Sequence, residues 1–255
     1  MQDPLDSTGR AVRGIRSRVA WGALALGLAS PAAAAPFLSV DFNTNASPNE
    51  SPDFTAFAGG GNAANNVLPT KSYSTAAVAS GSVTIRVAST PDVDANGDLN
   101  SSANIVAFNT RATPVDSGGF TYADLYRDFV YSNNSALSTY VQYDGLDALT
   151  SYAVTIYAVD PNSTKTTTLT DVTAGRTTAL GSIVSPSTYT GNETYSVTAT
   201  IESDSTGHIT VRASSTTFAT INGVRIEAVP EPTGLLLAAL AAPLVMGRRR
   251  RAAVR

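Results

Sequence analysis

Residues 92–100 carry oxygen-bearing side chains at alternate positions, a pattern that suits the binding of a hard cation. The four candidate ligands for Ca²⁺ are Asp92, Asp94, Asn96 and Asp98. Gly97 supplies the residue that the sharp turn of a calcium loop needs, but the twelfth position is Ala103, where a bidentate acid is expected. The sequence therefore predicts a weak calcium site, with a solvated acidic turn between two strands as the alternative.

Side chains suited to catalysis are scarce. The chain has no cysteine, one histidine (His208) and no Gly-x-Ser-x-Gly turn, so thiol and serine nucleophiles lack their usual setting. His208 falls on the polar phase of a predicted strand, where we expect it to be solvated. Asp124 and Asp128 could pair as a glycosidase requires, although an acid near a strand start more often holds backbone amides. We therefore expect no catalytic site.

Tyrosine offers a third kind of chemistry, because sugar-binding proteins stack pyranose rings on exposed aromatic side chains. The chain has ten tyrosines and a single tryptophan, Trp21, which lies near the N-terminus. The candidates for such a platform are Tyr122, Tyr126, Tyr131, Tyr140 and Tyr157. The alternative is that these rings fill the rim of the core and leave their hydroxyl groups in water.

Residues 35–229 are predicted to form the single domain that positions these side chains. Apolar and polar residues alternate with a period of two, and no window shows the period of a helix. The predicted strands are 37–42, 83–87, 104–109, 128–132, 137–143, 152–159, 166–173, 194–201, 208–212 and 219–227. Only 122–126 favours a short helical turn, and 43–81 is expected to carry long loops. The pattern predicts an all-β fold, an antiparallel β-sandwich.

The last predicted strand needs an irregularity. Ile221 is out of phase with Val224 and Ile226, and a bulge at Asn222–Gly223, with glycine in the left-handed region, would bring all three to one face. This apolar-Asn-Gly-apolar strand resembles the closing strand of galactose-binding-like and malectin-like jelly rolls. Three further segments fit the same template: Val40–Phe42, Tyr126–Phe129 and Leu149–Tyr152. The resemblance spans most of 37–227 in short pieces, and it implies a jelly-roll sandwich without assigning any sugar-contacting residue.

The N-terminus has the parts of a secretory signal peptide. Arginines up to Arg18 precede an apolar run of 11 residues, Val19–Ala29, and small residues follow it. A bilayer span needs about 20 apolar residues, so this run is too short to be one. We predict cleavage after Ala34, with Ala32 and Ala34 as the small pair, so that residues 1–34 are a signal peptide.

The C-terminus joins a Pro-Glu-Pro motif to an apolar stretch of 15 residues, 233–247, and an arginine cluster. The motif residues are Pro230, Glu231 and Pro232, and the cluster is Arg248, Arg249, Arg250 and Arg251. As a transmembrane helix the stretch is marginal, about 22 Å long against a hydrocarbon core of about 30 Å, with the arginines on the cytoplasmic side.

This order at the extreme C-terminus resembles the PEP-CTERM sorting signal of Gram-negative bacteria and covers residues 230–255. The resemblance implies an exosortase, a membrane transpeptidase-like protease, as processing partner, and transient membrane anchoring. It also implies an association with extracellular polysaccharide and biofilm. An ordinary single-span anchor is the alternative.

The charge distribution narrows the range of partners. Between Ala34 and Met246, eight basic residues stand against 18 acidic ones, a net charge of −10. Such a surface repels phosphate backbones, so we expect no nucleic-acid partner. The sequence as a whole favours a non-enzymatic protein exported across the inner membrane to the cell surface, with a structural or adhesive role in the extracellular polymer layer. A carbohydrate-binding module is the first alternative, and a glycan-acting hydrolase is the second.

Overall fold

The computed structural model describes residues 36–44, 53–57, 68–100, 106–110, 124–132, 138–186 and 195–229. The chain divides into two units, Met1–Ala32 and Ala33–Arg255, and every described residue belongs to the second. The predicted signal peptide, with Ala32 and Ala34, and the predicted sorting signal 230–255 lie outside the described residues. Within the described ranges, no helix has the length and apolar character needed to cross a bilayer.

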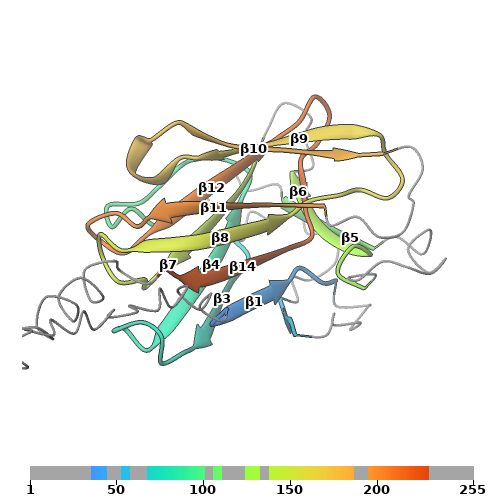
Figure 1. The fold of residues 1–255 in the computed structure, drawn as a ribbon. Helices are drawn as coiled ribbons and strands as arrows, with labels where there is room; N and C mark the ends of the chain where they lie inside the picture. The colour runs from blue at the N-terminus through green and yellow to red at the C-terminus, as the bar shows by residue number, and fades with distance from the viewer. Residues whose placement is uncertain are drawn as a thin grey trace, which may run out of the picture. The chain divides into compact units, whose positions relative to one another are not determined.

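The described strands form three β-sheets (Figure 1). The first, in the order β11–β8–β14–β1–β2, contains Ser196–Glu202, Ser151–Tyr157, Gly223–Ala228, Leu38–Asp41 and Thr55–Ala56. The second, in the order β10–β9–β12–β7–β4–β3, contains Thr178–Ser185, Lys165–Asp171, Ile209–Ser214, Thr139–Asp144, Ser82–Ala88 and Thr70–Ser74. The third, in the order β13–β6–β5, contains Thr220–Ile221, Asp128–Ser132 and Val106–Thr110. Apart from the parallel pair β1–β2, the described strands pair antiparallel, so the predicted all-β antiparallel fold is confirmed.

The two larger sheets enclose one apolar core. The first sheet contributes Val40, Tyr152, Val154, Ile156, Val224 and Ile226, and the second contributes Val83, Ile85, Val87, Val141, Tyr143, Ile209 and Val211. These residues are at alternate strand positions, as a period of two requires, and nearly all were expected from the sequence pattern. Burying each side chain stabilises the fold by about 1.5–3 kcal/mol, so the core fixes which face of each strand points outward.

The chain changes sheets at Asn222, between β13 and β14. The fully buried Asn222 side chain stabilises this crossing, because its Oδ1 accepts a hydrogen bond from the backbone N–H of Val159 at 2.6 Å and its Nδ2 donates to the carbonyl oxygen of Asp128 at 2.9 Å. The predicted strand is therefore interrupted at Asn222–Gly223 by a change of sheet rather than by a bulge, and the apolar residues on both sides of the interruption are buried.

The left-handed geometry expected for Gly223 was wrong. Its φ does not lie in the left-handed region; instead, the backbone of a neighbouring strand passes too close for a side chain. A Cβ at this position would lie 2.7 Å from the carbonyl oxygen of Val40 and 2.6 Å from the Leu125 Cδ1 atom. Close approach, rather than backbone conformation, is therefore what requires glycine here.

Three strands were not expected from the sequence. β2 and β3 lie inside the 43–81 segment for which long loops were predicted, and β10 contains a register shift between Ala179 and Gly181. β3 and β10 are edge strands of the second sheet, and only Tyr73 of β3 is buried. A strand with one buried side chain shows no apolar alternation, which explains why the period of two did not reveal it. The predicted helical turn is a plain turn over 124–127.

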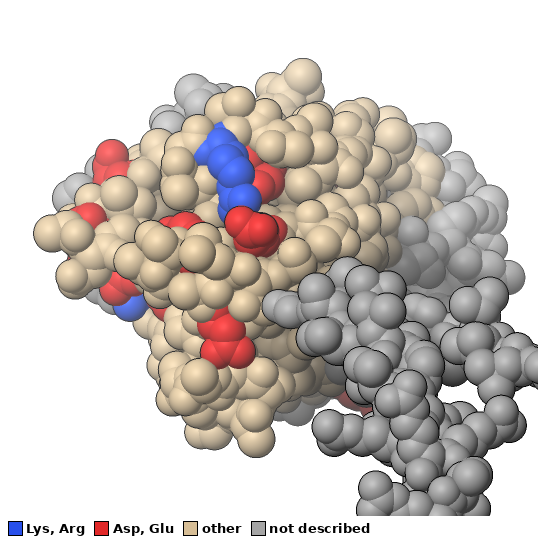
Figure 2. All heavy atoms as spheres, turned by 60° about the vertical axis from the view of Figure 1, so that its left-hand side comes forward, with Lys and Arg blue, Asp and Glu red and all other residues tan. Residues whose placement is uncertain are grey.

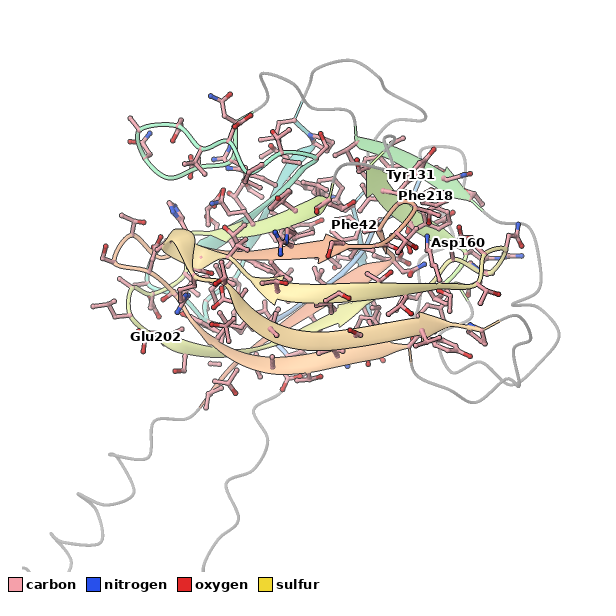
Figure 3. The ribbon with its side chains drawn as sticks, turned by 90° about the horizontal axis from the view of Figure 1, so that it is seen from above. Phe42, Tyr131, Asp160, Glu202 and Phe218 are labelled. Atoms are coloured by element: carbon pink, nitrogen blue, oxygen red, sulfur yellow. The ribbon has the colours of Figure 1, made fainter. Side chains whose placement is uncertain are left out.

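The labelled residues of Figure 3 mark two regions of the domain that differ in chemistry. At one end Tyr131 lies against Phe218, with ring centroids 5.2 Å apart, and the buried Lys165 ammonium lies 4.0 Å from the Phe218 ring and 3.6 Å from Asp160 Oδ2. Glu202 marks the other end, where its carbonyl oxygen accepts a hydrogen bond from Arg176. The candidate site lies beside Arg176.

Candidate functional site

The outer face of the six-stranded sheet carries the polar side chains of three adjacent strands. Because side chains alternate across a sheet, the residues between the core positions of β4, β7 and β12 point away from the core. They include Thr84, Arg86 and Ala88 on β4, Tyr140, Gln142 and Asp144 on β7, and Thr210 and Arg212 on β12. All six residues of β7 are buried, so this face is covered by other parts of the chain.

The 91–100 segment provides that cover. Gln142, which is fully buried, fastens it to the sheet: its Oε1 accepts a hydrogen bond from the Leu99 backbone N–H at 2.6 Å, and its Nε2 donates to the Gly97 carbonyl oxygen at 2.8 Å. The same Nε2 lies 3.2 Å from Thr210 Oγ1. Leu99 packs against Tyr140 in a small apolar cluster separate from the main core. The segment is thus a structured cover for the sheet.

A cavity of about 460 Å³ remains between the 91–100 segment and the 172–177 turn. The residues that line it are Pro91, Val93, Gly97, Leu99, Tyr140, Gln142, Val172, Ala174, Gly175, Arg176, Thr177, Asp204, His208 and Thr210. Tyr140 and Gln142 come from the sheet itself, the valines and Leu99 are apolar, and Arg176, Asp204 and His208 carry the charge or the potential for it. This combination of mostly apolar lining with a few polar groups is typical of small-molecule sites, whose volumes run from about 300 to 1,000 Å³.

Beside the cavity, His208 faces two aspartates that share one arginine. His208 Nε2 lies 3.3 Å from Asp98 Oδ1 and 4.0 Å from Asp144 Oδ1. The other carboxylate oxygens are held by Arg86, whose Nη2 is 2.8 Å from Asp98 Oδ2 and whose Nε is 2.5 Å from Asp144 Oδ2. Burial raises the pKa of Asp144 to about 6 and the charge of Asp98 adds to this rise, while hydrogen bonding to Arg86 opposes it.

The second ring nitrogen of His208 faces the 204–208 turn. His208 Nδ1 lies 3.1 Å from Thr206 Oγ1 and 3.7 Å from Asp204 Oδ2. Partial burial works against ionisation of Asp204, but hydrogen bonds from the His208 backbone N–H and from Thr206 outweigh it and lower the pKa of Asp204. Gly97, at φ +85°, packs on the other side, and a Cβ there would lie 3.2 Å from His208 Nδ1. The expectation that His208 is solvated was wrong, because the 91–100 segment buries it.

The predicted calcium ligands divide between two roles. Asp94 Oδ1 accepts hydrogen bonds from the backbone N–H groups of Asn96 and Asp98, as in a turn closed by its own side chain. The Asp98 carboxylate faces Arg86 and His208 instead. In the described part of the chain, neither Asp92 nor Asp94 belongs to a cluster of three or more acidic or histidine residues whose ligand atoms lie within 4.8 Å of one another. Calcium binding by these residues stays a prediction.

The predicted tyrosine platform does not form as one surface. Tyr126 and Tyr157 lie in the core with ring centroids 6.4 Å apart, and Tyr131 lies beside Phe218. Tyr140 alone among the described candidates lines the cavity, and Tyr122 lies outside the described residues.

Asp124 and Asp128, which could have paired as in a glycosidase, differ in burial. The Asp128 side chain is fully buried, whereas that of Asp124 is 43% exposed and lies 3.8 Å from Arg127.

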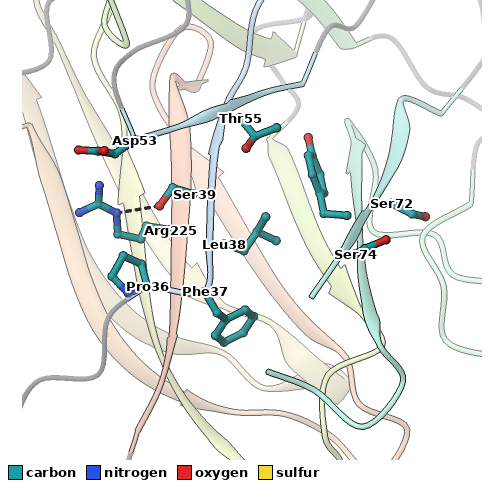
Figure 4. Close-up of a pocket in the computed structure, with 10 residues that line it drawn as sticks. Pro36, Phe37, Leu38, Ser39, Asp53, Thr55, Ser72, Ser74 and Arg225 are labelled. Carbon is teal, nitrogen blue, oxygen red and sulfur yellow. Dashed lines mark hydrogen bonds between the residues drawn. The ribbon is translucent and has the colours of Figure 1, made fainter. Parts of the chain in front are cut away.

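A second hollow of about 830 Å³ lies between β1, β2 and β3 (Figure 4). Its one basic side chain, Arg225, donates a hydrogen bond from Nε to Ser39 Oγ at 3.1 Å and lies 4.9 Å from the Phe54 ring. Burial raises the pKa of Tyr73, which keeps its hydroxyl group neutral. We place the candidate site in the cavity on the other sheet, because that cavity is bounded by the 91–100 segment, which Gln142 holds to the sheet.

No family model and no curated protein matches this chain. Among solved structures, it is similar to a Clostridium thermocellum xylanase 10B structure that contains CBM22-1 and GH10 modules, complexed with xylohexaose, at 11% identity and a TM-score of 0.32. That match covers 48% of this chain and 24% of the xylanase chain. A family 6 carbohydrate-binding module of Cellvibrio mixtus lichenase 5A, complexed with cellotriose, matches at 16% identity and a TM-score of 0.28, over 49% of this chain and 88% of the module. A family 35 module from C. thermocellum matches at 13% identity and a TM-score of 0.27, over 49% and 92%. We transfer no residue role from these structures.

Arg86, Gln142 and Asp144 were not singled out in the sequence. The available signal was the alternation in 140–144, where Tyr140, Gln142 and Asp144 occupy the phase opposite Val141 and Tyr143. That signal assigns a face of the strand but does not identify which loop covers it.

Proposed function

We propose that this chain is an exported protein, retained at the cell surface, whose β-sandwich binds a carbohydrate of the extracellular polymer layer. The observation that carries the binding role is the cavity on the outer face of the six-stranded sheet, which joins an aromatic ring, Tyr140, to a polar rim. The two sequence signals support export and retention: the N-terminal segment has the parts of a signal peptide, and residues 230–255 have the order of a PEP-CTERM tail. An exosortase-type enzyme is the processing partner that this tail implies.

The cavity has the chemistry that a sugar requires. Tyr140 offers an apolar ring against which a pyranose face can pack, and Leu99 and Val172 extend that apolar surface. Arg176 and Asp204 at the rim can exchange hydrogen bonds with hydroxyl groups. On the face shown in Figure 2 most of the surface is uncharged and the acidic side chains form separate patches, which suits a neutral polymer.

A hydrolase is the less favoured alternative for this cavity. Glycosidases need two carboxyl groups about 5–9 Å apart on either side of the sugar. Of the described residues that line the cavity, only Asp204 is acidic, and its Oδ1 accepts hydrogen bonds from the backbone N–H groups of Thr206 and His208. Asp98 and Asp144 are tied to Arg86, outside the lining. The geometry therefore supports binding better than bond cleavage.

A glycan array probed with the purified full chain tests the proposal, followed by titration calorimetry with the best ligand. Thr177 is exposed and lines the cavity, so Thr177→Trp should fill the opening without breaking a described contact and weaken binding at least about 10-fold, or 1.4 kcal/mol. Thr178→Trp is the matched control, since Thr178 is also exposed but does not line the cavity. Binding that responds equally to both changes, or to neither, would place the sugar elsewhere. Release of reducing ends from the ligand would point to the hydrolase.

A further inference from the structure

Three ligand atoms meet beside the cavity although they come from separate parts of the chain. Asp98 is in the 91–100 segment, Asp144 ends β7, and His208 precedes β12. Their ligand atoms all lie within 4.8 Å of one another, and His208 Nε2 is 3.3 Å from Asp98 Oδ1. A tetrahedral ion with bonds of about 2.0–2.2 Å separates its ligand atoms by roughly 3.4 Å, so a slight contraction of this group would bring the three atoms to that spacing and leave a fourth position for water.

Arg86 leaves these oxygens free to act as ligands. It holds the Oδ2 atom of each aspartate, and the two Oδ1 atoms remain turned toward His208. The Asp144 residue is 7% exposed, and its Oδ1 is a buried oxygen with no hydrogen-bond partner among the described atoms. A buried carboxylate oxygen without a partner is unfavourable unless a cation or a proton donor meets it.

We propose that Asp98 Oδ1, Asp144 Oδ1 and His208 Nε2 bind one divalent transition-metal ion of the zinc type. One imidazole nitrogen with two carboxylate oxygens suits Zn²⁺ and its neighbours, whereas Ca²⁺ takes six to eight oxygen ligands. The site differs from the calcium site predicted in the same segment, and it does not depend on carbohydrate binding.

The surroundings of His208 match those of a metal-bound histidine. A ligating imidazole usually donates its other N–H to an oxygen that fixes the ring, and here Thr206 Oγ1 and Asp204 Oδ2 face Nδ1. With a neutral imidazole, Asp98, Asp144 and Asp204 together with Arg86 carry a net charge of −2, which a dication would cancel. The ion would join the 91–100 segment to β7 and β12, and so would stabilise one wall of the cavity.

The single histidine of the chain gives a direct test. The untagged, ¹⁵N-labelled full chain is stripped with a chelator and titrated with Zn²⁺ at mildly alkaline pH. One equivalent should shift the Nε2 resonance of His208, and calorimetry should give one zinc ion per chain. Ca²⁺ should leave the ring nitrogens unchanged.

Two aspartate variants and one control locate the ligands. Asp98→Asn and Asp144→Asn preserve side-chain shape and should each weaken Zn²⁺ binding by at least about 100-fold, the upper end of what outer-shell partners alone contribute. Asp92→Asn, in the same segment but outside the group, should leave Zn²⁺ binding unchanged. The proposal is overturned if Zn²⁺ does not shift the ring resonances of His208, or if both aspartate variants bind Zn²⁺ as tightly as the parent. Asp98, Asp144 and His208 would then be only an ion-paired cluster.

Discussion

Replacing Gln142 by leucine should loosen the 91–100 segment from the sheet. The leucine side chain has a similar size but cannot hydrogen-bond, so the change removes the contacts to Leu99 N–H, the Gly97 carbonyl and Thr210 Oγ1 without leaving a large void. Leu99 is buried, and its orphaned N–H should cost about 1–3 kcal/mol. The Gly97 carbonyl is less deeply buried and should cost about 1 kcal/mol. The expected total is about 2–4 kcal/mol.

Native-state hydrogen exchange measures this effect where it arises. A loss of about 2–4 kcal/mol corresponds to roughly 30- to 1,000-fold faster exchange of the Leu99 amide, provided that exchange occurs through release of the segment. Amides of the β8–β14 pair should change only if the whole domain is destabilised. The same variant should weaken sugar binding, because Leu99 lines the cavity.

Thr210→Val is the matched control for this prediction. It removes only the contact at 3.2 Å and keeps both backbone partners of Gln142, so we expect less than about 1 kcal/mol. If Leu99 exchange is the same in the Gln142 variant as in the parent, the segment is held by apolar packing and the hydrogen-bond argument is wrong. An equal effect of both variants would show that the loss of Thr210, rather than of the backbone partners, matters.

The remaining predictions concern one glycine, one asparagine and the tail. Gly97→Ala and Gly175→Ala both force alanine into the left-handed region at about 1–2 kcal/mol, but only at Gly97 would the new methyl group press on a ring, so Gly97→Ala should lower the melting temperature further. Asn222→Ala should reduce the free energy of unfolding in urea by about 2–5 kcal/mol, because two buried backbone groups lose their partners, while the exposed Asn162→Ala should change it by less than about 0.5 kcal/mol. Deleting residues 230–255 should move the protein from the cell surface to the medium in fractionated cultures, and unchanged surface levels would refute the sorting proposal.

Parts of the fold were predictable because burial leaves a local mark on the sequence. The alternation of Val83, Ile85 and Val87 predicted a half-buried strand, and the structure has one at Ser82–Ala88. The 128–132 strand was predicted at its observed bounds. The pattern failed at Thr70–Ser74, where one buried side chain gives no alternation, and at Gly223, where the constraint comes from a neighbouring strand rather than from the residue's own backbone.

The sequence by itself determined the class of fold, the outward phase of each main strand and the chemical character of the two ends, because each depends on residues close together in the chain. Only the tertiary structure decided that Asp98, Asp144 and His208 meet and that Gln142 fastens the cover above them. Antiparallel pairing of β12 with β7 brings His208 beside Asp144, and the hydrogen bonds of Gln142 to Leu99 and Gly97 hold Asp98 next to them. The alternation of apolar and polar residues shows which side of a strand faces the core, but it does not show which distant segment covers the other side. That covering segment encloses the cavity and buries His208.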